Sequence, residues 1–258
     1  SMLALVSGST VEDLVDERSD VDMSIVLTAL PAEDLLRTAC RQVSGSEWIW
    51  KLGDWADGGG VVAFLVDGIE VQIAYCTASK LNHDLDELLL RHNPDTPLHK
   101  LAEGLLKAWP LAGHERLLAL QHRLAAFPPE LGLAMIRHGL ATPMPWRIVP
   151  QLLHRDAGIW LRELQVEACY RLLLVLCGLN ERYCTRFQVK RQGRVASQLH
   201  LAPVQLSERM DAMLAAPPLQ AFALLHALEG EVLDLVARHH PEVDLDAARQ
   251  RRALFPPA

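Results

Sequence analysis

Two aspartates, Asp20 and Asp22, carry the strongest chemical signal in the chain. Asp20 directly precedes the segment VDMSIVL at residues 21–27, and Asp22 is its second residue. This segment alternates and then becomes continuously apolar, as a largely buried strand does. Residues two apart on a strand project from the same face, so this spacing places two carboxylates side by side. Like charges held that close are unfavourable without a cation, and Mg²⁺ prefers carboxylates together with substrate phosphates. The pair therefore predicts a site for a divalent metal.

Gly8 and Ser9 follow the preceding apolar run and provide the other half of such a site. Glycine lets the backbone approach a ligand closely, and the amides of the turn, with the Ser9 hydroxyl, can hold phosphate oxygens. Ten residues separate Ser9 from Asp20. Turn, spacing and strand together predict phosphoryl or nucleotidyl transfer by in-line displacement at phosphorus, with metal neutralising charge on the phosphates.

Short strands in the first third of the chain must position these residues. The apolar runs 3–6 and 21–27 predict two strands, and the helical spacing of residues 31–43, which begins at a proline, predicts a helix. Residues 61–66 and 69–75 flank the dipeptide Asp67-Gly68. Because Asp-Gly favours a tight type I′ turn, we expect a β-hairpin there.

From about Leu81 onward strand signals nearly vanish, and helical patterns rich in Leu, Ala and Arg take over. They are clearest at residues 115–126, 161–177, 207–215 and 219–238. The shift in composition predicts an α+β protein with two domains. We expect a small domain of residues 1–92, with a mixed sheet and flanking helices, followed by an all-α helical-bundle domain of residues 93–258.

The pattern hydrophobic-Gly-Ser, about ten residues, then Asp-hydrophobic-Asp-hydrophobic resembles a known signature. It is that of the polymerase-beta-like nucleotidyltransferase superfamily, which includes the bacterial aminoglycoside nucleotidyltransferases. The resemblance implies that residues 1–92 form a nucleotidyltransferase catalytic domain, and the helical remainder looks like the C-terminal domain of the aminoglycoside group. It also implies Mg²⁺ as cofactor, with ATP or another nucleoside triphosphate as co-substrate.

The resemblance implies roles for Glu70 and Lys190 as well. Members use a third carboxylate on a neighbouring strand, as a metal ligand or as the base that takes a proton from the acceptor hydroxyl. Glu70, in GIEVQI, stands in the matching context and joins Asp20 and Asp22 as a catalytic and metal-binding candidate. A glutamate beside an Asp-Gly turn is also typical of the wet face of a hairpin. Lys190, in LNERYCTRFQVKR, is a candidate phosphate contact or part of a solvated basic patch.

The composition limits the partners. A formal net charge of −7 and a pI near 5.9 argue against a stable complex with nucleic acid, whereas a nucleotide and a small acceptor remain compatible. The five cysteines form no CxxC pair, so neither a zinc module nor a disulfide framework is indicated. Since no apolar run reaches the roughly 20 residues that span a bilayer, we expect a cytoplasmic protein without a membrane partner.

Three functions stay open on the sequence alone. The leading one is transfer of a nucleoside monophosphate, AMP from ATP, onto a hydroxyl of a small acceptor, with release of pyrophosphate. The second is the same chemistry on a protein or an RNA end. The third is a nucleotide-binding or interaction protein whose catalytic machinery has decayed.

Two further groups have simpler interpretations. The acidic cluster Asp84, Asp86 and Glu87 leads into a Leu-rich helix, where acids near the N-terminus interact favourably with the helix dipole. Three tryptophans, at positions 48, 50 and 55, could stack on a base or a sugar, but tryptophans more often serve packing.

Overall fold

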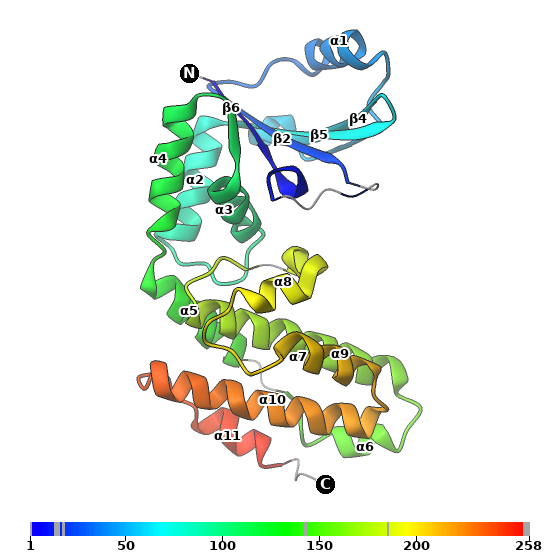
Figure 1. Cartoon of the computed structure of the whole chain (residues 1–258), viewed down its shortest axis with the longest axis vertical. Coiled ribbons are helices and arrows are strands. Elements are labelled where there is room, and N and C mark those ends of the chain that lie inside the picture. Colours follow the sequence, from blue (N-terminus) through cyan, green and yellow to red (C-terminus); the bar gives the residue numbers. More distant parts are fainter. Residues whose placement is uncertain (1, 13–15, 17–18, 142–143, 185, 255–258) are drawn as a thin grey trace. The chain divides into compact units, whose positions relative to one another are not determined.

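The computed structural model describes residues 2–12, 16, 19–141, 144–184 and 186–254, with only the backbone for residues 186–188. In these ranges a six-stranded mixed sheet near the N-terminus is followed by a helical region (Figure 1). The predicted α+β class is therefore confirmed. The chain divides into two compact units, which comprise residues 1–91 with 101–126 and residues 92–100 with 127–258.

The first unit is built on a sheet with the strand order β3-β4-β5-β2-β1-β6. β2 and β5 are parallel, and the other neighbouring strands are antiparallel. The strands are β1 (Leu3–Ser7), β2 (Val21–Leu27), β3 (Trp50–Leu52), β4 (Gly59–Val66), β5 (Ile69–Thr77) and β6 (Trp109–Ala112).

The local predictions for this unit are largely confirmed. β1 and β2 occupy the two predicted strand segments, and the predicted helix is α1 (Glu33–Ser44). β4 and β5 form the predicted hairpin, in which Asp67 and Gly68 have φ angles of 50° and 85°. Positive φ at both central positions is the requirement of a type I′ turn.

Two short strands were not predicted. β3 has three residues, and β6 has four, among them Pro110. Neither is long enough to show a period, and proline is confined to edge strands or bulges within sheets. The expectation that strands end near Leu81 is wrong for β6, which is a strand because its backbone pairs with β1.

The register of the sheet assigns side chains to two faces. One row of directly paired residues runs across five strands and projects from a single face, here called the polar face: Trp50, Ala63, Gln72, Asp22 and Ser7. The opposite face is apolar. Its buried core consists of Cys40 from α1 with Val62, Phe64 and Ile73, and Trp48 and Trp55 pack against it.

Helices cover both faces of the sheet. α1 lies over the apolar face through Cys40, and α2 (Ala78–Leu89) lies on the other side, where Lys80 reaches toward Gly59 and Cys76 (Figure 1). α2 begins at Thr77, whose hydroxyl accepts a hydrogen bond from the Lys80 amide and caps the helix. α3 (Leu98–Lys107) and α4 (His114–Ala125) follow along the chain. The predicted carboxylates Asp22 and Glu70 lie at the other end of the polar face, where β2 and β5 begin.

The second unit consists of helices in its described part. The main ones are α5 (Pro129–Ala141), α6 (Val149–Leu153), α7 (Gly158–Leu179), α8 (Gln192–Ser197), α9 (Leu206–Ala215), α10 (Pro218–His239) and α11 (Asp246–Arg252). α5 and α7 approach closely, since a methyl group on Gly178 would lie 2.6 Å from the carbonyl oxygen of Gly132. Among the described helices, none is both long and apolar enough to cross a membrane.

The four predicted helical segments are confirmed as parts of α4, α7, α9 and α10. Residues 101–126 pack with the sheet, so the first compact unit extends beyond residue 92. The division into a catalytic domain of residues 1–92 and a helical domain of residues 93–258 stays a prediction.

Candidate active site

Gly8 lies directly against the carboxylate of Asp22. Ser7 pairs with Asp22 at the end of β1, so Gly8 is the first residue beyond the strand. Its φ of 70° falls in the left-handed region that favours glycine. A methyl group on its Cα would lie 2.1 Å from Oδ2 of Asp22. The missing side chain at residue 8 therefore makes the space that the Asp22 carboxylate occupies.

Ser9 continues this turn. It lies in η1 (Gly8–Val11), a 3₁₀ segment that packs against β2, and it is half-buried. Residues 13–15, 17 and 18, which separate this turn from β2, lie outside the described residues. The structure thus brings together Gly8, Ser9 and Asp22, three of the predicted site residues, at the junction of β1 and β2.

Gln72 connects two further predicted residues, Asp20 and Glu70. Its Nε2 donates a hydrogen bond of 2.6 Å to Oδ2 of Asp20 and another of 3.0 Å to Oε1 of Glu70. Gln72 is also the direct partner of Asp22 in the parallel β2–β5 pair. Gln72 was not among the predicted site residues, although strand period would have placed it on the same face as Glu70, two residues earlier.

Trp50 completes this set of contacts. Its indole Nε1 donates a 2.9 Å hydrogen bond to Oε1 of Glu70, and 37% of the residue surface is exposed. Trp48 and Trp55 lie on the apolar face, with stacked rings whose centroids are 6.3 Å apart. The packing interpretation is confirmed for these two. Trp50 differs because it belongs to the opposite face of the sheet.

The donor set fits a hard divalent cation at Asp20 and Asp22. Gln72 pairs with Asp22 in the sheet and donates to Asp20, so both carboxylates lie on the polar face. The Asp22 carboxylate fills the space where a Cβ of residue 8 would stand, an arrangement here called the cradle at Gly8. Glu70 does not extend this pair into a preformed three-carboxylate site. Among the described residues, no group of three or more His, Cys, Asp or Glu side chains could hold a metal ion. Instead, the Gln72 amide is shared by Asp20 and Glu70. Metal binding by Glu70 stays a prediction.

A lysine anchors the chain just after η1. Nζ of Lys107 lies 3.2 Å from Oε2 of Glu12 and 2.6 Å from Oε1 of Glu103. Glu12 directly follows η1, and Lys107 is the last residue of α3. The ion pairs therefore connect the end of η1, which contains Gly8 and Ser9, to α3 of the same unit.

The remaining sequence candidates lie elsewhere. Lys190 is exposed in η3 (Arg186–Arg191), which belongs to the second unit, and its predicted phosphate contact stays a prediction. The acidic cluster on α2 lies inside the helix rather than at its N-terminus. Its members form ion pairs with basic side chains of the first unit: Asp84 with Lys80, Asp86 with Arg123, and Glu87 with Arg91. These pairs account for the cluster without a ligand.

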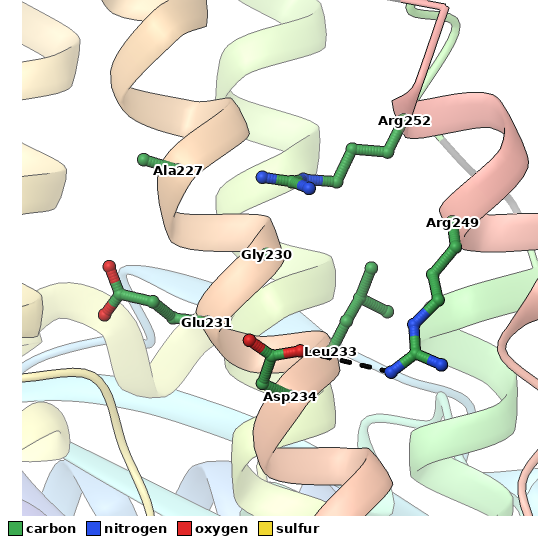
Figure 2. A pocket seen from close by; sticks show the side chains of 7 residues that line it. All are labelled: Ala227, Gly230, Glu231, Leu233, Asp234, Arg249 and Arg252. Carbon is green, nitrogen blue, oxygen red and sulfur yellow. Dashed lines mark ion pairs between the residues drawn. The ribbon is translucent and has the colours of Figure 1, made fainter. Parts of the chain in front are cut away.

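A pocket of about 230 Å³ lies in the second unit between α10 and α11 (Figure 2). Its lining residues are Ala227, Gly230, Glu231, Leu233, Asp234, Arg249 and Arg252. Both acidic lining residues have an ion-pair partner: Asp234 lies 4.0 Å from Arg249, and Glu231 lies 2.6 Å from Arg209, which is not part of the lining. None of the predicted site residues lines this pocket.

Known proteins give little information about the function of this chain. No family model matches the chain, and no curated protein matches it. Among solved structures, the crystal structure of a nucleotidyltransferase-like protein from Exiguobacterium sibiricum 255-15 is similar with a TM-score of 0.35 and 14% sequence identity. The match covers 93% of this chain and 70% of that chain. A TM-score of this size is too low to assign function, so the assignment depends on the site residues themselves.

Proposed function

We propose that this protein is a metal-dependent nucleotidyltransferase that moves AMP from ATP onto a hydroxyl of a small-molecule acceptor and releases pyrophosphate. The cradle at Gly8 is the observation that carries the proposal. Oδ2 of Asp22 lies 2.1 Å from the position of an absent Cβ, beside a half-buried turn and on the face of the sheet where Gln72, the strand partner of Asp22, donates to Asp20. A glycine turn against paired carboxylates suits a metal-bound polyphosphate.

Each site residue has a role in this proposal. Asp20 and Asp22 hold Mg²⁺, which when bound neutralises charge on the phosphates. The backbone at Gly8 and the hydroxyl of Ser9 hold phosphate oxygens. Glu70, on the adjacent strand β5, takes the proton of the acceptor hydroxyl. Mg²⁺ binding, the use of ATP and the acceptor are all parts of the proposal.

The charge of the chain favours a small acceptor over a nucleic acid. The protein has 32 acidic against 25 basic residues. An acidic protein attracts cationic molecules and repels the phosphate backbone of nucleic acids. The aminoglycoside-type enzymes that the sequence resembles act on cationic, hydroxyl-bearing molecules. We therefore propose an acceptor of that class.

Thermal unfolding with ATP, with and without Mg²⁺, tests whether nucleotide binds at these carboxylates. Ligand at about 100 times its Kd adds roughly 2.7 kcal/mol to the free energy of unfolding. We expect a Mg²⁺-dependent rise in Tm in the wild type that Asp22→Asn loses. Asp67→Asn is the matched control, because it removes one negative charge from an exposed hairpin turn of the same unit and asparagine tolerates positive φ.

Pyrophosphate release during a screen of cationic acceptors then separates an enzyme from a binding protein. Release in the wild type and in Asp67→Asn, but not in Asp20→Asn or Asp22→Asn, would support the proposal. Undiminished turnover in both site variants would exclude these carboxylates. A Mg²⁺-dependent rise in Tm without release for any acceptor would favour a nucleotide-binding protein with decayed catalysis.

A further inference from the structure

Glu70 is held from two sides, and we propose that its two donors, Trp50 and Gln72, are positioning residues that assign this carboxylate to the acceptor hydroxyl rather than to the metal. The inference rests on the proposed function and specifies how the same site divides its carboxylates. We call the three side chains the Glu70 clamp.

The hydrogen bonds distinguish the two oxygens of Glu70. Oε1 accepts from Nε1 of Trp50 at 2.9 Å and from Nε2 of Gln72 at 3.0 Å. Because a carboxylate oxygen offers about two lone-pair sites, these donors fill the capacity of Oε1. Among the described residues no donor reaches Oε2. Oε2 is therefore the oxygen that can accept a proton from a substrate.

The fold allows this contact through a small residue. Trp50 on β3 pairs with Ala63 on β4, and Ala63 pairs with Gln72 on β5. Neighbouring strands are about 4.8 Å apart, so the indole must cross the whole width of β4 to reach β5. Ala63 is fully buried and has only a methyl group, which leaves room for a large side chain to pass over it. Tryptophan has the length and the terminal N–H that this reach requires.

The same amide separates Glu70 from the aspartate pair. Nε2 of Gln72 donates to Oδ2 of Asp20 at 2.6 Å as well as to Glu70, so one donor group lies against both carboxylates. A cation shared by Asp20 and Glu70 would have to replace that amide. With the clamp formed, the metal is left to Asp22 and the other oxygen of Asp20.

The clamp then defines the transfer step. The acceptor oxygen forms a bond to the α-phosphorus of ATP while the bond from that phosphorus to the bridging oxygen breaks. Pyrophosphate leaves with the electron pair of the broken bond. The proton of the acceptor hydroxyl passes to Oε2 of Glu70, whose orientation Trp50 and Gln72 maintain.

Indole NMR of the full-length protein tests the contact itself. The chain has six tryptophans, and the signal lost in Trp50→Phe identifies the Trp50 indole N–H. We expect Glu70→Gln and Gln72→Met to move this signal. An unmoved signal in Glu70→Gln would overturn the clamp, whether or not the protein is an enzyme.

Metal affinity and kinetics test the division of roles. The EPR signal of unbound Mn²⁺ should give the same affinity within about twofold for wild type, Trp50→Phe and Glu70→Gln, and at least tenfold weaker binding for Asp22→Asn. Trp50→Phe should lower kcat about 10- to 100-fold, as loss of a supporting contact does, without raising KM for ATP. Trp109→Phe is the matched control, since Trp109 is exposed and pairs with Val6 on the opposite face of the sheet.

A double-mutant cycle excludes a merely structural role for Trp50. If Trp50 acts through Glu70, Trp50→Phe should cause no further loss of kcat in the Glu70→Gln background. Equal loss in both backgrounds, or Mn²⁺ affinity that falls tenfold or more in Glu70→Gln, would overturn the inference. Absence of both Mn²⁺ binding and pyrophosphate release in the wild type would instead refute the proposed function, and with it the catalytic role of the clamp.

Discussion

Replacement of Gly8 by alanine tests the cradle at Asp22 most directly. The left-handed conformation costs an alanine about 1–2 kcal/mol, of which roughly 0.4–1 kcal/mol is offset by the lower entropy of the unfolded chain. The new Cβ would stand 2.1 Å from Oδ2 of Asp22. Since heavy atoms are in optimal contact at about 3.5–4.0 Å, the carboxylate must move by more than about 1 Å. An off-rotamer side chain adds about 0.5–1.5 kcal/mol.

Gly45→Ala provides the matched control. Gly45 follows α1 in the same unit with a φ of 68°, close to the 70° of Gly8, but an added Cβ there meets nothing within 4 Å. We expect this control to lose about 1 kcal/mol in free energy of unfolding, from the backbone term alone. Gly8→Ala should lose about 1.5–2.5 kcal/mol, because the shift of Asp22 adds to that term.

Urea denaturation of both variants measures these losses, and Mn²⁺ EPR with ATP measures the consequence for the site. Gly45→Ala should bind Mn²⁺ and ATP as the wild type does. Gly8→Ala should bind both at least tenfold more weakly and lose about 10²-fold in turnover, since a misplacement of about 1 Å has that effect on a catalytic group. Two variants of equal stability and equal metal affinity would refute the idea that the absent side chain at residue 8 shapes the site.

Three further predictions concern titratable groups. Burial lowers the pKa of His99 from 6.5. The contribution of His99 to the free energy of unfolding is therefore present above that value and is lost as the pH falls through the folded pKa. The free energy of unfolding should decline below about pH 6.5, and the decline should be smaller in His99→Gln. Burial raises the pKa of Glu229 despite its hydrogen bond from Trp146. The contribution of Glu229 to the free energy of unfolding is therefore fully present below pH 4.5 and is lost as the pH rises through the folded pKa. In urea denaturation at pH 8, Glu229→Gln, which keeps an acceptor for Trp146, should be at least as stable as the wild type, and a less stable variant would contradict this. Burial also raises the pKa of the half-buried Cys76 to about 11 and of the buried Cys169 to about 12. A disulfide reagent at pH 8 should therefore label both thiols much more slowly in the native than in the unfolded protein, and equal rates in the two states would contradict this.

Local patterns were enough to predict much of the first unit. Strand period, helix period and turn chemistry each depend on residues only a few positions apart. The sequence therefore predicted β1, β2, the helix α1 and the Asp67-Gly68 turn. The same period placed Asp20 and Asp22 on one face. The short strands β3 and β6 have too few residues to show a period, so only their pairing reveals them.

The contacts at the candidate site depend on the pairing of distant strands and not on local sequence patterns. Trp50, Gln72 and Glu70 meet because three strands pair in one register, and a shift of one residue would send each side chain to the opposite face. Nothing near Trp50 in the sequence distinguishes it from Trp48, yet Trp50 donates to a site carboxylate and Trp48 packs against the apolar core. Register is set by contacts between distant segments.

The sequence by itself determined the α+β class, the paired aspartates and the glycine turn, since each depends on residue type and short spacing. Only the tertiary structure decided that Gly8 makes room for Asp22, that Gln72 is shared by Asp20 and Glu70, and that residues 101–126 pack with the sheet. These features depend on which strands become neighbours and which side chains meet across them. Such pairings are a property of the whole folded unit, because no short segment contains both partners.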